Sequence, residues 1–211
     1  KTVNLKQLIN KPTVLCFVYY RCPGICSPLM NGLAESIAKS GLALNKEYQV
    51  LTISFDSREH YDLGAKKRTT YLEKIKGQDG DGWIFLTGDS SNIEKATKAL
   101  GFRYKFVNNE FMHEGALMMI SPEGKITRYL KGISFLPLEY KLAVHEAAKG
   151  KSAPTLIKVL QFCYSYDRKA ERYSLEVTRI AATITIFFAV VLLVFLLFKG
   201  RRNKIKKLTN N

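Results

Sequence analysis

Two largely apolar runs, at residues 13–20 and 48–55, dominate the hydrophobic pattern of the chain. Both are rich in β-branched and aromatic residues, which is typical of strands buried on both faces of a sheet. Shorter runs at 83–86, 115–120 and 125–130 predict further strands, the last two joined by a Ser-Pro-Glu-Gly turn. The pattern therefore predicts a central sheet.

Apolar residues four positions apart follow the first predicted strand. Leu29, Leu33 and Ile37 mark one helical face, with Ser27 as the expected N-cap and Pro28 as the first helical residue. Three more helices are expected, at residues 62–75, 91–101 and 137–149. Strands that alternate with helices and then end in a hairpin and a helix indicate a three-layer α/β/α sheet.

The C-terminal part of the chain has a different pattern. Residues 180–198 contain no charged side chain, and as a helix they would span about 28 Å, close to the hydrocarbon thickness of a bilayer. We interpret them as a transmembrane helix, because a helix in a protein core would rarely lack a polar face over that length. The expected division is a folded domain at 1–151, an aromatic juxtamembrane linker at 152–178, a membrane helix at 179–199 and a tail at 200–211.

Charge gives the expected orientation in the membrane. The chain has 33 basic and 18 acidic residues, a net charge of +15, and six of the basic residues follow the apolar run at 199–207. The positive-inside rule places this tail in the cytoplasm and the domain on the other side, which requires a signal peptide ahead of Lys1. Attraction to anionic lipid accounts for the basic tail, so nucleic acid is not an expected partner.

The first predicted strand leads into two cysteines, Cys22 and Cys26, at the start of the next predicted helix. Pro23 and Gly24 favour a tight connection between them, and the positive end of the helix dipole stabilises thiolate. Two thiolates in this position can hold a soft metal ion or carry out thiol–disulfide chemistry. A cysteine pair directly after a long buried strand suits a thioredoxin-like fold.

His113 is the candidate third ligand, because it precedes a strand expected to approach the cysteine turn. Two thiolates and one imidazole suit copper, especially copper(I), whereas structural zinc sites usually close with four ligands. The other histidines, His60 and His145, fall in stretches expected to be solvated. A structural or redox disulfide formed by Cys22 and Cys26 is the alternative to a metal site.

Five further residues have simpler explanations. Met112 is more readily loop filler than a soft ligand, and Cys16 lies inside a predicted buried strand, where a thiol is inert. Asp56 and Arg58 follow the second strand, where α/β proteins often place function, but solvated loop charges are commoner. Cys163 falls in the linker and receives no role.

Five segments, taken in chain order, resemble the Sco/SenC family of copper proteins: FVYYRCPGICSPLMNGL, ISFDSRE, WIFLTGD, GFRYKF and FMHEGALMMISPEGKITRYLKGI. The C-terminal FCYSYD segment and apolar run are similar to a branch linked with bacterial haem-copper oxidases. The resemblance implies a thioredoxin-like domain that binds copper through Cys22, Cys26 and His113. It also implies a periplasmic domain tethered to the bacterial inner membrane by a single span.

Three functions follow from this resemblance and from the residues. The leading hypothesis is a metallochaperone that delivers copper to the dinuclear centre of subunit II of a haem-copper (cytochrome c) oxidase. The second is a thiol–disulfide oxidoreductase in which Cys22 and Cys26 reduce the cysteines of that subunit. The third is an accessory subunit held permanently in a respiratory complex or supercomplex. A peroxiredoxin is disfavoured, because its threonine-containing cysteine loop is not visible around Cys22.

Overall fold

The computed structural model describes residues 2–108, 110–151, 164–167, 172–175, 181–182, 184–192 and 195. The chain forms two compact units, Lys1–Ala153 and Pro154–Asn211. All the site residues considered below belong to the first unit.

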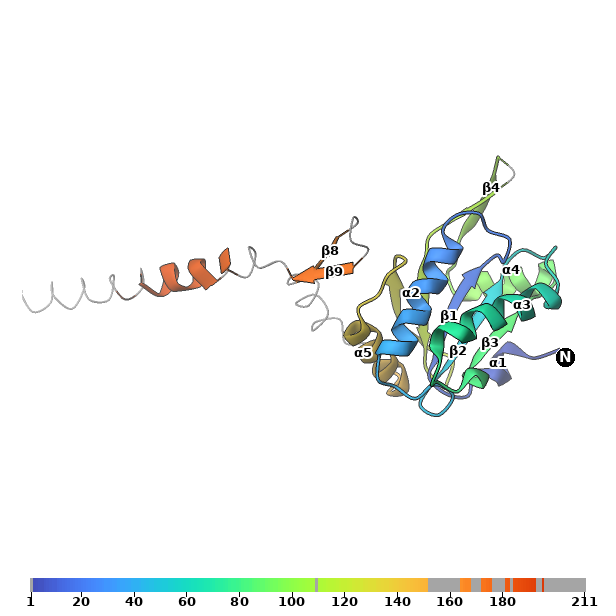
Figure 1. Ribbon diagram of the computed structural model, residues 1–211, viewed down its shortest axis with the longest axis horizontal. Helices are drawn as coiled ribbons and strands as arrows, with labels where there is room; N and C mark the ends of the chain where they lie inside the picture. The colour runs from blue at the N-terminus through green and yellow to red at the C-terminus, as the bar shows by residue number, and fades with distance from the viewer. Residues whose placement is uncertain are drawn as a thin grey trace, which may run out of the picture. The chain divides into compact units, whose positions relative to one another are not determined.

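A five-stranded mixed sheet of order β3-β2-β1-β6-β7 forms the centre of the first unit (Figure 1). Its strands are β1 (Thr13–Val18), β2 (Gln49–Ser54), β3 (Trp83–Leu86), β6 (Ala116–Ile120) and β7 (Ile126–Lys131). β1 pairs in parallel with β2 and antiparallel with β6, and β2 pairs in parallel with β3. β1 and β2 are buried at every position, as their largely apolar runs predict.

The helices of this unit are α1 (Leu5–Leu8), α2 (Cys26–Lys39), α3 (Tyr61–Leu72), α4 (Ser90–Ala99) and α5 (Pro137–Ala148), with short 3-10 turns η1 (Glu73–Ile75) and η2 (Gly80–Gly82). Adjacent residues of β1 show that both faces of the sheet are covered, since neighbouring strand residues point to opposite faces. Cys16 Sγ lies 4.0 Å from Met30 Sδ of α2, whereas the Phe17 ring packs against Phe102, just after α4, at 4.9 Å. The mixed α/β, thioredoxin-like fold is therefore confirmed.

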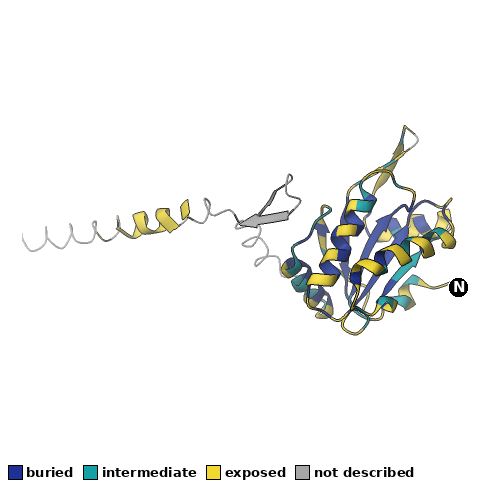
Figure 2. Ribbon diagram, viewed as in Figure 1, coloured by how far each residue is buried: buried dark blue, intermediate teal, exposed yellow. Residues whose placement is uncertain are grey.

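Figure 2 shows buried residues concentrated in the strands and on the inward side of α2. Leu29, Leu33 and Ile37 are all fully buried, so the four-residue spacing correctly identified the inner face of this helix. Gly32 allows α2 to approach closely, because a methyl group at this position would press against the backbone of Ile133.

The start of α2 differs from the prediction. The helix begins at Cys26, one residue before the expected N-cap, Ser27, and Ile25 occupies the cap position with no side-chain cap hydrogen bond. The first turn is closed by the Leu29 N–H, which donates to the Ile25 carbonyl at 3.0 Å. As a result Cys26 is fixed by helical backbone rather than by the preceding loop.

A second difference is a two-stranded hairpin, β4 (Tyr104–Val107) and β5 (Glu110–His113), that was not predicted. Figure 1 shows β4 extending beyond the end of the main sheet. His113, expected in a loop, is the last residue of β5 and pairs with Tyr104. The short helix α1 was not predicted either, and the predicted strands and helices of this unit lie within a few residues of their expected positions.

In the second unit the described residues include a hairpin of β8 (Tyr164–Asp167) and β9 (Arg172–Leu175), within the predicted linker. Residues 181–182, 184–192 and 195 are helical, and the other positions of the predicted membrane helix at 179–199 lie outside the described residues, as does the tail at 200–211. Within the described part of the chain, no helix has both the length and the apolar character needed to cross a bilayer.

Candidate metal centre

The loop between β1 and α2 presents the first cysteine. The Cys22 N–H donates to the Tyr19 carbonyl at 3.1 Å, and the Gly24 N–H donates to Cys22 Sγ at 3.3 Å. Cys22 is half-buried, whereas Cys26, held at the first position of α2, is only 4% exposed. The two sulfurs therefore differ in their access to solvent and to partners.

The hairpin brings His113 to the second cysteine. Its Nε2 lies 3.4 Å from Cys26 Sγ, and its Nδ1 lies 3.1 Å from the Glu114 carbonyl oxygen. A carbonyl only accepts hydrogen bonds, so Nδ1 carries the proton and donates it. Burial lowers the pKa of His113, and the opposing effect of the Glu114 carbonyl is smaller. The lowered pKa keeps the ring neutral. The Nε2 lone pair is therefore directed toward the cysteines, the arrangement that second-shell contacts give to metal-binding histidines.

Aromatic rings surround the imidazole of His113. Its centroid lies 5.1 Å from that of Phe55, 5.7 Å from that of Phe102 and 6.3 Å from that of Tyr19. Tyr19 and Phe55 also pack edge-to-face against Phe111 of the same hairpin. This packing restricts the rotation of the imidazole and lowers the local dielectric around it.

The structure brings all three predicted ligands together. The sulfurs of Cys22 and Cys26 and the ring nitrogen of His113 lie within 4.8 Å of one another. Metal–sulfur bonds of about 2.3 Å place two ligand atoms roughly 4 Å apart in a planar three-coordinate site. The donor set therefore fits a single ion after a small closure, and its soft thiolates select copper over magnesium or calcium.

The two thiols are electrostatically unequal. Burial opposes ionisation of Cys22, but hydrogen bonds from the Cys26 amide and thiol, the Tyr19 hydroxyl and the Gly24 amide outweigh it, so the pKa of Cys22 lies below its ordinary value. Burial raises the pKa of Cys26 well above its ordinary value, and the neighbouring Cys22 adds to this effect. Cys22 is therefore the thiol of the pair that ionises first.

Among the described residues, those that sequence analysis set aside do not join the cluster of three ligands. Met112 is 64% exposed and alternates with His113 along β5, so it faces the opposite side of the hairpin. Cys16 is fully buried, and burial raises its pKa to about 12, as expected for an inert core thiol. His60 and His145 are exposed, and Cys163 lies outside the described residues.

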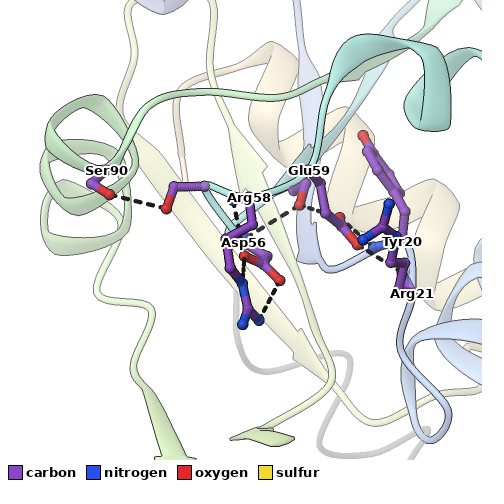
Figure 3. Close-up of polar contacts among 8 residues, drawn as sticks. Tyr20, Arg21, Asp56, Arg58, Glu59 and Ser90 are labelled. Atoms are coloured by element: carbon purple, nitrogen blue, oxygen red, sulfur yellow. Dashed lines mark hydrogen bonds and ion pairs between the residues drawn. The ribbon is translucent and has the colours of Figure 1, made fainter. Parts of the chain in front are cut away.

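Sequence reasoning favoured solvated loop charges at Asp56 and Arg58, and this is wrong for Asp56, whereas Arg58 is exposed. Asp56 is buried, and both of its carboxylate oxygens accept hydrogen bonds from the Arg58 guanidinium, at 2.8 and 2.7 Å. This hydrogen-bonded guanidinium holds the pKa of Asp56 below its usual range. Both residues belong to the turn that follows β2, next to the cysteine loop (Figure 3).

Sequence reasoning missed Glu59, the next residue of this turn. Glu59 is 2% exposed and accepts hydrogen bonds from the backbone N–H groups of Tyr20 and Arg21, at 2.7 and 2.8 Å (Figure 3). No local pattern distinguishes it from a solvated acidic residue, because the two backbone N–H groups that it binds come from another part of the chain. The glutamate fixes the segment that leads into Cys22.

A thioredoxin-like domain with two thiols and one imidazole within ligand distance is the class of protein that this fold and site define. The chain matches the family model described as SCO1/SenC over residues 1–140, about two thirds of its length. The chain therefore belongs to the SCO1/SenC family, as its motifs indicated.

Three solved structures illustrate the similarity. A crystal structure from Aquifex aeolicus VF5 is 28% identical, with a TM-score of 0.61 over 69% of this chain and 83% of its own. Arabidopsis thaliana ScoI with copper bound is 20% identical, with a TM-score of 0.51 over 69% and 86%. BsSco, a member of the Sco family of cytochrome c oxidase assembly proteins with a disulfide switch, is 22% identical, with a TM-score of 0.52 over 71% and 85%. No curated protein sequence gives a significant match.

Proposed function

We propose that this protein binds one copper ion as cargo through Cys22, Cys26 and His113 and delivers it during assembly of a haem-copper oxidase. The observation that carries the proposal is the convergence of two sulfurs and a neutral imidazole nitrogen within 4.8 Å. Membership of the SCO1/SenC family supports it, as does the copper held by the Arabidopsis relative of the same fold.

The arrangement suits transfer as well as binding. Three ligands leave copper open to attack by a ligand of the acceptor, whereas a four-coordinate structural site is closed. Cys22 is the more accessible of the two thiolates, so an acceptor thiol would displace it before Cys26. Copper loading also requires Cys26 to lose its proton, which couples binding to pH.

The acceptor in this proposal is the dinuclear copper centre of oxidase subunit II. The domain acts on the extracytoplasmic side of a bacterial inner membrane, tethered by the apolar segment at 179–199 with the basic tail in the cytoplasm. Cell fractionation and protease treatment of spheroplasts test this location. Recovery of the full chain in the soluble fraction would contradict the tether, and protection of the domain in intact spheroplasts would contradict its orientation.

Copper(I) competition against a chromogenic chelator tests the metal site directly. The reduced chain should retain one equivalent, Cys22→Ser and Cys26→Ser should lose retention, and His113→Ala should weaken it. Met112→Leu is a matched control, since Met112 is exposed beside His113 and faces away from the site. Failure of the reduced wild-type chain to take up equimolar copper(I) would refute the proposal.

Thiol–disulfide exchange is a second candidate, favoured by the unequal thiols. The Cys22 thiolate would attack a disulfide of the partner, forming a mixed disulfide and releasing one partner thiolate. Cys26, once deprotonated, would then attack Cys22 Sγ and release the second partner thiolate, leaving the partner reduced by two electrons and Cys22–Cys26 oxidised. This reaction needs no imidazole ligand, so full activity of His113→Ala in oxidase assembly would favour it over copper delivery.

A further inference from the structure

The turn Asp56–Glu59, between β2 and α3, contacts both of the segments that supply ligands. We propose that this turn, here called the 56–59 turn, is a positioning element for the metal ligands. Through Glu59 it holds the cysteine loop, the segment between β1 and α2 that carries Cys22. Through Arg58 it holds the β4–β5 hairpin, which carries His113. The inference rests on the proposed copper function, because it concerns how the ligands of that site are held in place.

Glu59 provides the connection to the cysteine loop (Figure 3). One carboxylate oxygen accepts from the Tyr20 N–H at 2.7 Å and from the Ser54 hydroxyl at 2.6 Å, and the other accepts from the Arg21 N–H at 2.8 Å. The Phe55 N–H continues the sheet beside this point by donating to the Val18 carbonyl at 2.9 Å. The backbone just before Cys22 is thus tied to the end of β2 by charge-assisted bonds.

A carboxylate is well matched to this role, because it only accepts hydrogen bonds. Glutamine has the same shape, but its amide nitrogen would face one of the two backbone N–H groups and could not accept from it. Glu59→Gln should therefore release one of these N–H groups without changing the volume of the side chain. Aspartate at position 59 keeps both acceptor oxygens on a shorter side chain.

Arg58 provides the connection to the hairpin. Asp56 fixes its guanidinium through two hydrogen bonds, and the Arg58 N–H also donates to Asp56 at 3.0 Å. The guanidinium carbon lies 5.7 Å from the ring centroid of Phe106 on β4 and 5.5 Å from that of Phe111 on β5. These are cation–π distances. Phe111 is two residues before His113, on the same face of the strand.

Two neighbouring residues of one turn thus act on different ligands. Loss of the Glu59 contacts should loosen the approach to Cys22 and leave the hairpin in place. Loss of the Arg58 contacts should loosen the hairpin that carries His113 and leave the cysteine loop in place. If the turn only stabilised the fold, substitution of either residue would loosen both ligand segments together or neither of them.

The experiment compares Glu59→Gln and Arg58→Gln with the wild-type chain. Glu110→Gln and Arg103→Gln are matched controls, because Glu110 and Arg103 are exposed residues at the same hairpin. In the metal-free, reduced chain, Glu59→Gln should accelerate hydrogen exchange at the amides of residues 20 and 21. Arg58→Gln should instead shift the imidazole resonances of His113.

Copper(I) competition forms the second readout. Both variants should weaken copper binding by roughly ten- to hundredfold, the usual effect of removing a contact that orients a metal ligand, and the controls should match wild type. Glu59→Asp should recover part of the affinity, which separates loss of the carboxylate from a failure to fold. Position-specific effects of this kind support the inference.

The result that would overturn the inference is distinct from failure of the proposed function. If wild type binds copper and both variants match it in affinity, amide exchange and imidazole resonances, the 56–59 turn positions nothing and copper binding stands. If wild type takes up no copper(I), the proposed function fails. In that case the metal-free exchange and imidazole measurements still decide whether the turn holds the two segments separately.

Discussion

Cys22 should be alkylated by iodoacetamide at least about tenfold faster than Cys26 in the metal-free, reduced chain at pH 7. A thiol with the ordinary pKa of 9.0 is about 1% ionised at this pH, and only the thiolate reacts. Hydrogen bonds lower the pKa of Cys22, so its ionised fraction exceeds about 1%. Burial raises the pKa of Cys26, so its ionised fraction lies well below that value. Each unit of difference between the pKa values of Cys22 and Cys26 changes the ratio of their thiolate fractions tenfold.

Two further effects adjust this ratio. A thiolate of lower pKa is less nucleophilic. On a logarithmic scale this offsets roughly half of the rate advantage that Cys22 gains from its larger thiolate fraction. The limited access to Cys26, which is 4% exposed, acts in the opposite direction and favours Cys22. A rate ratio of about ten or more therefore remains. The logarithm of the Cys22 rate should rise with pH and level off below pH 9.

Peptide-level mass spectrometry after timed labelling measures each cysteine separately. Cys16 is an internal control, because it is fully buried with a pKa raised to about 12 and should be labelled only after unfolding. In concentrated guanidinium chloride the differences should disappear. Equal labelling of Cys22 and Cys26 while Cys16 stays protected would refute the conclusion that Cys22 ionises first.

Three other predictions concern packing, an ion pair and pH. Gly32→Ala should lower the free energy of unfolding by about 1–3 kcal/mol in urea denaturation, because the methyl group presses on the Ile133 backbone. Gly24→Ala, where a methyl group meets nothing within 4 Å, should change it by less than about 0.5 kcal/mol, and equal losses would contradict the packing argument. Arg128→Met should cost about 2 kcal/mol in the same assay, since it removes the bidentate partner of the largely buried Glu146 carboxylate, and an unchanged midpoint would count against this. Copper(I) affinity, measured by competition at pH 6 and pH 7, should rise with pH by roughly tenfold per unit for each proton released, and a flat profile would show that no thiol proton is displaced.

The pattern of apolar residues predicted the elements whose signal is contained in a single segment. The runs at 13–20 and 48–55 form β1 and β2, and every position of both strands is buried, which matches their largely apolar sequences. The β4–β5 hairpin was missed, although Phe102, Tyr104 and Phe106 alternate with other residues at the period of a strand. Asn108, with a φ of +49°, marks its turn, so a closer reading of the alternation could have found it.

The site was predictable to a different degree for each residue. Cys22 and Cys26 are close in sequence, so their spacing alone brings the sulfurs together. His113 approaches because the unpredicted hairpin carries it there. Its place before a strand expected to approach the cysteine turn had pointed to it, and the family resemblance agreed. Glu59 has no local signal at all, since its partners at Tyr20 and Arg21 lie nearly forty residues earlier in the chain. Tertiary contacts of this kind cannot be read from propensity or period.

The three ligands are held in place to different degrees, which bears on whether copper is bound permanently or carried as cargo. The His113 ring is enclosed by aromatic side chains and oriented by the Glu114 carbonyl, and Cys26 is buried in the first turn of α2. Cys22 is half-buried, as His113 is, but it lies on a loop rather than in a helix or strand. A site that retained its metal permanently would gain from burying every ligand, because exposed ligands allow exchange with outside thiols. In the function that we propose, His113 and Cys26 hold copper while Cys22, on its loop, is exchanged for a ligand of the acceptor.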